Sequence, residues 1–172
     1  MLNELFDISR IEQGQLTIRA VPLDLSALLL TLVNAMQPDM PRHTLHTSGL
    51  ELAQTILGDE VRLIQVFENL IKNAVKYSPF GGNVWIKLEA SSNHVQVSVR
   101  DEGIGIPTVD LPHLFQCFYR ASNSGRWRIA GTGIGLYVVA EILRRHGASI
   151  RVQSIEGAGS DFVVQLPLVD SG

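Results

Sequence analysis

The stretch DEVRLIQVFENLIKNAVKYSP, residues 59–79, constrains the fold of this chain more than any other. Its apolar side chains recur at helical spacing and predict one long helix, with Asp59 as its N-cap and Pro79 behind its end at Tyr77. A helix that gathers its apolar residues on one face has to bury that face against a second layer of structure. The residues of this face are Leu63, Ile64, Phe67, Leu70, Ile71 and Ala74.

The second layer is predicted by segments in which apolar and polar residues alternate. Two of them flank a tip at residues 91–93 and predict a β-hairpin. Strands are expected at residues 44–47, 54–57, 84–88, 95–99, 150–155 and 162–166, and helices at 1–15, 25–36, 59–77 and 134–146. Helices and mostly antiparallel strands in mixed order indicate the α+β class, with one sheet backed by helices.

The composition excludes several other classes of protein. With 172 residues, 45% of them apolar and 18% charged, the chain suits one globular domain and is not disordered. A net charge of −3 argues against a large nucleic-acid or anionic-membrane surface. The single cysteine, Cys117, excludes an internal disulfide and fits a reducing compartment. No stretch approaches the roughly 20 apolar residues of a membrane span, so we expect a cytoplasmic domain, with any inner-membrane anchor elsewhere in a longer parent protein.

A polar stripe runs along the long helix. At 100° per residue, Arg62, Gln65, Asn69, Asn73 and Lys76 fall in one band. Asparagine is a poor helix former because its amide competes for backbone hydrogen bonds, so two of them four residues apart require an explanation. One interpretation is a plain solvated face. The other is a site in which the two amide oxygens bind a hard cation such as Mg²⁺ and the lysine meets phosphate.

An aspartate ends the return strand of the hairpin with the parity of a core residue. In HVQVSVRDEGIGIP, Asp101 falls on the same face as the valines, so its carboxylate is aimed toward the core. A buried carboxylate is costly unless a donor pairs with it. One alternative is a turn in which Asp101 bonds its own loop. The other is a carboxylate that accepts from the exocyclic amine of a flat ligand such as adenine, with Gly103 and Gly105 clearing space beside it.

Three glycines, two residues apart, precede the last helix in AGTGIGLYVVAEILRRHG, residues 130–147. The dinucleotide fingerprint would need Gly or Ala where Leu136 or Val138 stands, and a P-loop would need a Gly-Lys pair, which the chain lacks. Backbone amides at a helix N-terminus attract anions, and glycine lets an anion come close. The alternative is a plain glycine-rich turn.

In chain order, four motifs resemble those of the ATP-binding catalytic domain of sensor histidine kinases, which shares a superfamily with the gyrase B, Hsp90 and MutL ATPases. NLIKNAVKYSP resembles the N box, DEGIGIP the first glycine box, LFQCFYR the F box and GTGIGL the second glycine box. The resemblance covers residues 1–168. It implies a Bergerat-type two-layer α/β sandwich, in which a mixed, mostly antiparallel sheet packs on three helices and a short helix precedes them.

The resemblance also implies a site for ATP and Mg²⁺. Asn69 and Asn73 would hold the Mg²⁺, Lys76 and Tyr77 would contact phosphate and ribose, and Asp101 would accept from the adenine amine. The other implied ATP contacts are Gly103, Gly105 and Ile106 beside the base, and Gly131, Thr132, Gly133, Gly135 and Leu136 in the phosphate loop.

Arg120, at the end of the F box, would contact the γ-phosphate, so the implied catalytic set is Asn73, Lys76 and Arg120. Residues 121–130 would form a mobile lid, seated by Phe115 and Phe118. Trp127 within it is either a docking residue or an exposed loop side chain. The resemblance assigns no general base, because the position that holds a glutamate in the related ATPases is Asn69 here.

The implied function is that of a two-component sensor kinase catalytic domain, which donates the γ-phosphoryl group of Mg-ATP to a histidine. None of the five histidines is followed by Glu or Asp, as the family's phosphoacceptor is, so the acceptor would lie in the dimerisation or histidine-phosphotransfer domain of a parent protein. A response regulator would be a partner through that parent. Residues 1–18 would be the end of the dimerisation helix and its linker, 19–168 the catalytic domain and 169–172 a tail; no contact with nucleic acid or membrane is expected.

Two alternatives remain open from the sequence. The first is a serine kinase of the anti-sigma type, built on a similar nucleotide fold, although the resemblance of LFDISRIEQGQLTIRAVPLDL to a dimerisation helix and linker speaks against it. The second is a degenerate module that binds nucleotide, or nothing, and works by docking.

Overall fold

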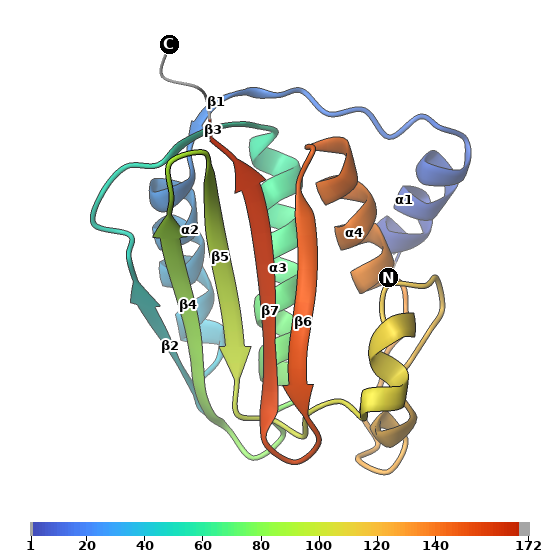
Figure 1. Ribbon diagram of the computed structural model, residues 1–172. Coiled ribbons are helices and arrows are strands. Elements are labelled where there is room, and N and C mark those ends of the chain that lie inside the picture. The colour runs from blue at the N-terminus through green and yellow to red at the C-terminus, as the bar shows by residue number, and fades with distance from the viewer. Residues whose placement is uncertain (1, 169–172) are drawn as a thin grey trace.

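The computed structural model describes residues 2–168, which form two layers, a β-sheet and the helices packed on one of its faces (Figure 1). The predicted tail at 169–172 lies outside the described residues. The helices are α1 (Leu2–Glu12), α2 (Leu25–Met36), α3 (Glu60–Lys76) and α4 (Gly135–Arg145). The strands are β1 (Val21–Asp24), β2 (His43–Ser48), β3 (Thr55–Gly58), β4 (Gly82–Ala90), β5 (His94–Asp101), β6 (Ser149–Ile155) and β7 (Gly159–Pro167).

The main sheet has five strands in the order β2-β4-β5-β7-β6. The β2–β4 pair is parallel and the other three pairs are antiparallel. Helices α2, α3 and α4 cover one face of this sheet (Figure 1). The predicted α+β class and the mixed, mostly antiparallel sheet on three helices are therefore confirmed.

The core lies between that face and the helices. Alternate residues of β4 and β5 are buried, as the hydrophobic alternation predicts. Phe67 of α3 and Ile142 of α4 are fully buried against them. Within residues 2–168, no helix combines the length and the apolar character that crossing a bilayer requires.

One expectation about the sheet is wrong. We expected a single sheet, but β3 pairs with β1 in a separate antiparallel ribbon, with Val21 opposite Gly58 and Asp24 opposite Thr55. Each strand of this ribbon leads into a helix, β1 into α2 and β3 into α3. Asp24 caps α2 by accepting from the Ser26 and Ala27 amides, and Asp59 caps α3 by accepting from the Arg62 amide.

Asp59 also ties the N-terminal linker to the long helix. Its Oδ2 accepts from the Arg19 amide at 2.9 Å, and its own backbone N–H donates to Nε2 of His146, at the end of α4, at 3.0 Å. Burial acts to raise the pKa of Asp59, but the amide hydrogen bonds and the nearby Arg62 and His146 hold this pKa below its ordinary value. The start of α3 is thus fixed by the linker and by α4 together.

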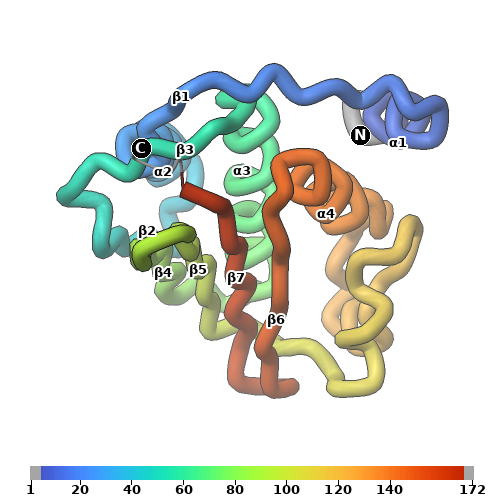
Figure 2. The backbone as a smooth tube through the Cα atoms, turned by 45° about the horizontal axis from the view of Figure 1, so that its top comes forward, coloured from blue at the N-terminus to red at the C-terminus, as the bar shows by residue number. Residues whose placement is uncertain are grey.

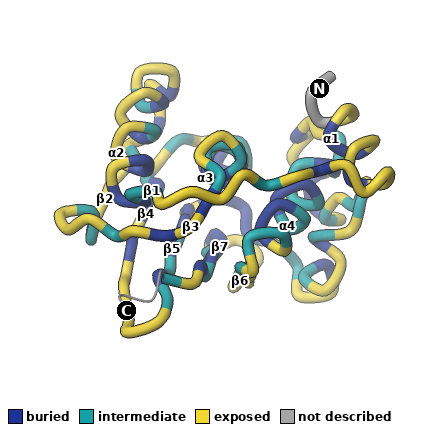
Figure 3. The backbone as a smooth tube through the Cα atoms, turned by 90° about the horizontal axis from the view of Figure 1, so that it is seen from above, coloured by how far each residue is buried: buried dark blue, intermediate teal, exposed yellow. Residues whose placement is uncertain are grey.

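Helix α1 lies beside α4, at the edge of the helical layer away from α2, as Figures 1 and 2 both show. Ile8 and Ile11 are buried there, whereas Leu5 and Phe6 face outward and are 50% and 64% exposed. The connection from α1 to β1 is mostly exposed (Figure 3). The side of α1 that packs in this structure therefore buries only part of its apolar residues and leaves Leu5 and Phe6 exposed.

A buried polar cluster joins α1 to α3. Asp7 is 6% exposed and accepts from Nη1 of Arg62 at 2.9 Å and from Nε2 of Gln65 at 2.6 Å. Arg62 also donates to Oε1 of Gln65 at 2.8 Å. The N-terminal half of the polar stripe on α3 therefore serves the attachment of α1.

We expect Asp7→Asn to weaken this attachment, because it leaves the Arg62 guanidinium partly buried without its counter-charge. The free energy of unfolding should fall by about 1–3 kcal/mol, and amide hydrogen exchange in α1 should accelerate. Thermal unfolding and hydrogen exchange measure the two effects.

The matched control is Glu68→Gln, which breaks the exposed Lys72–Glu68 pair of α3. Pairs of this kind contribute about 0–1 kcal/mol, so the control should leave stability and α1 exchange nearly unchanged. Equal effects of the two substitutions would contradict the role given to Asp7.

Candidate functional site

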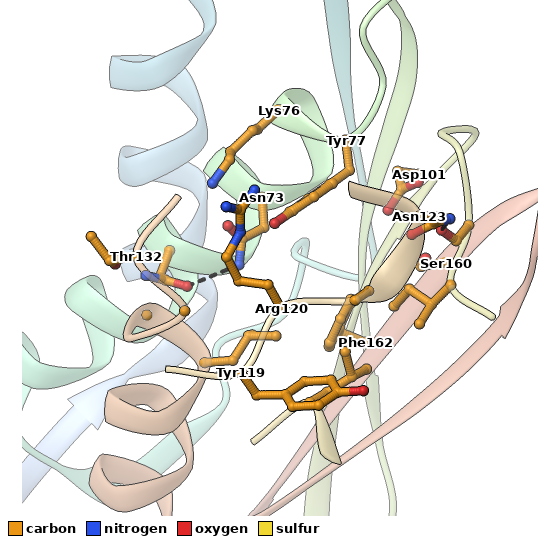
Figure 4. A pocket seen from close by; sticks show the side chains of 18 residues that line it. Asn73, Lys76, Tyr77, Asp101, Tyr119, Arg120, Asn123, Thr132, Ser160 and Phe162 are labelled. Atoms are coloured by element: carbon orange, nitrogen blue, oxygen red, sulfur yellow. Dashed lines mark hydrogen bonds between the residues drawn. The ribbon is translucent and has the colours of Figure 1, made fainter. Parts of the chain in front are cut away.

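A cleft opens between the C-terminal half of α3, the start of α4 and the end of β5 (Figure 4). Its volume is about 840 Å³ when the open mouth is included. Both polar and apolar side chains line this cleft, which is usual for a pocket that binds a small organic ligand.

The C-terminal half of the polar stripe forms one wall of this cleft. Asn69, Asn73 and Lys76 all line it, and Nδ2 of Asn73 donates to Oδ1 of Asn69 at 3.1 Å. The predicted stripe is thus divided in two, because its first two members bind Asp7. The plain solvated face is not what the structure shows.

Tyr77 follows at the C-cap of α3 and lines the same wall. Nζ of Lys76 lies 5.1 Å from the centre of its ring. Burial raises the pKa of the Tyr77 hydroxyl, and Arg120 partly opposes this shift. The phenol therefore stays neutral at physiological pH and can act as a hydrogen-bond donor.

Asp101 lies at the other end of the cleft, where it is 4% exposed, as its strand parity predicts. Its Oδ1 accepts from the backbone N–H of Gly103 at 2.8 Å. Asp101 therefore bonds its own loop, as the first alternative states, and it also lines the cleft, where a ligand could reach it.

The electrostatic state of Asp101 follows from this position. Burial raises the pKa of its carboxyl to about 6; the Gly103 and Ser160 backbone groups oppose the shift and Asp161 adds to it. At neutral pH the group is a buried carboxylate with few donors around it. A ligand that brings an N–H donor would relieve part of this cost.

The first glycine box is packed against backbone on two sides. A β-carbon on Gly103 would lie 2.1 Å from the Tyr77 carbonyl oxygen, and one on Gly105 would lie 2.0 Å from that of Ile155. Gly105 also has a φ of +64°, which favours glycine. Gly105 and Ile106 line the cleft, but Gly103 is not among the lining residues; its lack of a side chain lets the loop approach the end of α3.

The three glycines before α4 meet three different neighbours. Gly131 adjoins Nζ of Lys76, and Gly135 adjoins the side chain of Asn69. Gly133, at a φ of +74°, lies against the backbone of Phe118, whose N–H donates to its carbonyl at 2.9 Å. Gly133 and Gly135 line the cleft, whereas Gly131 does not.

Helix α4 begins without a side-chain cap, in contrast to α2 and α3. Its first residues, Gly135 and Leu136, line the cleft, as does Thr132 before them. Uncapped amides at a helix N-terminus carry partial positive charge. Together with Lys76 and Arg120 they make this end of the cleft suitable for an anion.

The F box and the segment after it close the cleft from the side of α4. Arg120 lines it and donates from Nη2 to the carbonyl of Ile129. Phe115 packs against the core, but Phe118 is 63% exposed and does not seat the lid as expected, because its left-handed backbone (φ 65°) turns the side chain outward. Trp127 is 42% exposed and meets Phe80 edge-on, with ring centres 5.7 Å apart.

The structure thus brings together nearly all the side chains and glycines that the sequence predicted for the site. The predicted residues that line the cleft are Asn69, Asn73, Lys76, Tyr77, Asp101, Gly105, Ile106, Arg120, Thr132, Gly133, Gly135 and Leu136. The lining residues that were not predicted are Leu114, Tyr119, Ala121, Asn123, Ser160 and Phe162. Tyr119 and Ala121 adjoin Arg120 in sequence, and from this neighbourhood their place in the site could have been predicted. Ser160 and Phe162 come from β7, and no local sequence pattern reveals that β7 pairs with β5.

The donors on α3 fit a Mg²⁺ ion that is shared with a ligand. The side-chain amides of Asn69 and Asn73 lie together in the cleft, and each offers one oxygen; Mg²⁺ usually takes only one or two protein oxygens beside phosphate and water. Among residues 2–168, no group of three His, Cys, Asp or Glu side chains could hold a metal by itself. A cation here would therefore depend on oxygens that the ligand supplies.

Comparison with known proteins gives one family for this fold and site. A family model described as "Histidine kinase-, DNA gyrase B-, and HSP90-like ATPase" matches residues 58–170. The chain is 33% identical to the signal transduction histidine-protein kinase BarA of Escherichia coli (strain K12), over 94% of this chain and 18% of that protein. It is 34% identical to the sensor protein GacS of Pseudomonas syringae pv. syringae, over 98% of this chain and 19% of that protein. It therefore spans less than a fifth of the length of either relative.

Solved structures agree with this assignment. The crystal structure of full-length ShkA in complex with AMPPNP matches with a TM-score of 0.83 and 25% identity, over 97% of this chain and 35% of that chain. The catalytic domain of the histidine kinase ThkA shares the fold with a TM-score of 0.71 at 24% identity, over 87% of this chain and 98% of that one. None of these relatives favours the serine kinase or the docking module.

The raised pKa of Asp101 predicts how stability depends on pH without ligand. Because the folded pKa of about 6 exceeds the ordinary 3.8, the neutral carboxyl stabilises the fold at low pH, and this contribution is lost as the pH rises toward 6. At about 1.36 kcal/mol per unit, the loss is roughly 3 kcal/mol. Asp101→Asn should therefore gain stability relative to the unmodified chain between pH 4 and 6, and the difference should level off above pH 6.

Denaturant unfolding of both proteins at several pH values measures this difference. Asp39→Asn, which changes an exposed aspartate, is the control and should show no comparable pH dependence. A difference between Asp101→Asn and the unmodified chain that stays constant from pH 4 to pH 8 would refute the prediction.

Proposed function

The chain belongs to the histidine kinase-, DNA gyrase B- and HSP90-like ATPase family and is an ATP-binding catalytic domain of the sensor histidine kinase type; from this premise we propose how it binds Mg-ATP and transfers the γ-phosphoryl group. The observation that carries the proposal is one cleft with a buried carboxylate at one end and amides, a lysine and an arginine at the other. An adenine nucleotide has the complementary order, with an amine at one end and phosphates at the other.

We propose that Asp101 accepts a hydrogen bond from the adenine amine, with Gly105 and Ile106 beside the base. Tyr77 and Lys76 then contact the ribose and the phosphates. The uncapped start of α4, with Thr132 and Gly133, donates backbone N–H groups to the phosphates. Asn69 and Asn73 would hold a Mg²⁺ ion, which would supply positive charge that neutralises the phosphates.

Catalysis in this proposal consists of positioning and charge stabilisation. Asn73, Lys76 and Arg120 lie at the anion end of the cleft and would bind the γ-phosphoryl group as it leaves ADP. The acceptor is a histidine of another domain, because none of the histidines in this chain carries the following acid that marks the family's phosphoacceptor. Exclusion of water by the lid would favour transfer to that histidine over hydrolysis.

The partners follow from the same proposal. We infer that residues 1–18 are the end of a dimerisation helix and its linker and that residues 19–168 are the catalytic domain. The phosphoacceptor then belongs to the dimerisation domain of a longer parent protein, and a response regulator receives the phosphoryl group from it. The use of ATP suggests a cytoplasmic location for the domain, which makes no direct membrane contact in this proposal.

Nucleotide binding is tested by thermal unfolding with and without Mg-ADP. Ligand at about a hundred times its Kd adds roughly 2.7 kcal/mol, which raises the Tm by several degrees. Asp101→Asn should lose this rise, and Asn73→Ala should bind ADP without dependence on Mg²⁺. Asn34→Ala, which removes an exposed asparagine of α2, should behave like the unmodified chain. A well-folded chain whose Tm does not move would reject the binding site.

Phosphoryl transfer is tested by mixing the chain and radiolabelled Mg-ATP with the separately produced dimerisation domain of the parent. We expect acid-labile label on that domain, and at least a tenfold lower rate with Arg120→Ala, since removing one charged contact to a transferring group typically costs about tenfold or more. Hydrolysis by the chain alone should be slow. Label on a serine of an added substrate would instead support the serine kinase.

A further inference from the structure

The carboxylate of Asp110 is buried at the base of the lid, outside the lining of the cleft. Asp110 lies in the 3₁₀ helix Thr108–His113 and is 4% exposed. Its Oδ1 accepts from the Tyr119 hydroxyl at 2.5 Å, and its Oδ2 accepts from the backbone N–H and the hydroxyl of Ser122 at 2.9 and 2.8 Å. A buried carboxylate with three donors is an organised structure and not an incidental surface contact.

The donors of this carboxylate flank the arginine of the cleft. Arg120 and Ala121 lie between Tyr119 and Ser122, so the carboxylate closes a ring across the turn formed by residues 119–122. Tyr119, Arg120 and Ala121 all line the cleft. Figure 4 shows Arg120 extending toward Asn73 while the Tyr119 ring points the other way.

The residue before this turn is held from the opposite side. Phe118 has a left-handed backbone, which a residue with a side chain adopts only where its surroundings enforce it. The enforcing contacts are its N–H bond to Gly133 on one side and the hydrogen bonds of Asp110 to Tyr119 and Ser122 on the other. The turn is therefore fixed at both ends, and the side chain of Arg120 leaves from its middle.

The far end of the turn leads to the base end of the cleft. Asn123 directly follows Ser122, is 5% exposed and lines the cleft near Asp101 (Figure 4). Its Nδ2 donates to the carbonyl of Gly105 at 3.0 Å, which fastens the lid to the first glycine box. The contact between Asp110 and Ser122 thus lies between two other hydrogen bonds that hold this segment, from Phe118 to Gly133 and from Asn123 to Gly105.

We propose that Asp110 is a positioning residue, which holds the turn at residues 119–122 so that Arg120 faces the terminal phosphate of the bound nucleotide. The inference rests on the proposed function, in which Arg120 contacts the γ-phosphate. Asp110 itself touches no substrate. Burial acts to raise the pKa of Asp110, but the hydrogen bonds from Tyr119 and Ser122 and the nearby His113 hold it below its ordinary value, so the carboxylate is charged at neutral pH.

The experiment compares the affinity of the chain for Mg-ADP and for a non-hydrolysable Mg-ATP analogue. The proteins are the unmodified chain, Asp110→Asn, Arg120→Ala and the double variant. Asp110→Asn should lower the affinity for the triphosphate analogue by roughly three- to tenfold and should change the affinity for ADP by less than about twofold. Arg120→Ala should remove the preference for the triphosphate, and the double variant should be no worse than Arg120→Ala, because both act through one contact.

Three outcomes would overturn the inference. In the first, Asp110→Asn lowers the affinities for ADP and for the triphosphate analogue equally, as a purely structural role of Asp110 requires. In the second, the effects of Asp110→Asn and Arg120→Ala add in full. In the third, Arg120→Ala keeps the preference for the triphosphate, which refutes the role of Arg120 as well. Failure of the unmodified chain to bind either nucleotide would refute the proposed function itself, and the inference with it.

Two milder variants keep the test available if Asp110→Asn does not fold. Tyr119→Phe removes one donor to the carboxylate and Ser122→Ala removes another, while the carboxylate and the Ser122 N–H remain. Each should show the same selective loss of triphosphate affinity at a smaller size. Asp39→Asn, an exposed aspartate in the 3₁₀ helix Gln37–Asp39, is the matched control and should change neither affinity.

Discussion

The helical register of α3 is the constraint on which the rest of the structure depends. A helix repeats its faces every 3.6 residues, so the apolar face and the polar stripe keep their directions along all 17 residues of α3. The apolar face packs on the sheet, the start of the stripe binds Asp7 of α1, and its end lines the cleft. A rotation by one residue, about 100°, would remove all three contacts together. One helix therefore joins the α1 contact, the core and the site.

The two ends of the cleft carry opposite charge, and at each end some of the charged or polar groups lack their usual partners. At one end a carboxylate is buried with few donors, and at the other a helix starts with its amides uncapped. Each is unfavourable in isolation, since buried charges and orphan amides both need partners. A ligand with a donor at one end and anionic oxygens at the other satisfies both. The specificity of the cleft thus follows from the hydrogen-bonding groups at its two ends that the protein itself does not fully pair.

The sequence predicts those parts of the molecule that depend on local period. The helices and strands are found where periodicity predicts them, and Asn69, Asn73 and Lys76 meet because helical spacing aligns them. Local period does not predict the β1–β3 ribbon, which depends on pairing between distant segments. Asp110 was missed for a similar reason: its partners Tyr119 and Ser122 reach it through an irregular loop that includes a left-handed Phe118. Irregular loops lack the periodicity that allows contacts to be predicted in helices and strands.

The strand order has a consequence for how the molecule assembles during synthesis. The last strand of the described chain, β7, inserts between β5 and β6 and brings Ser160 and Phe162 to the cleft. A chain still emerging from the ribosome has α3 and the β4–β5 hairpin long before β7, so the edge of β5 stays unpaired and the cleft lacks one wall. The lining of the cleft is therefore complete only when β7 has been made and paired. The cleft is thus a property of the whole domain and of no shorter N-terminal part of it.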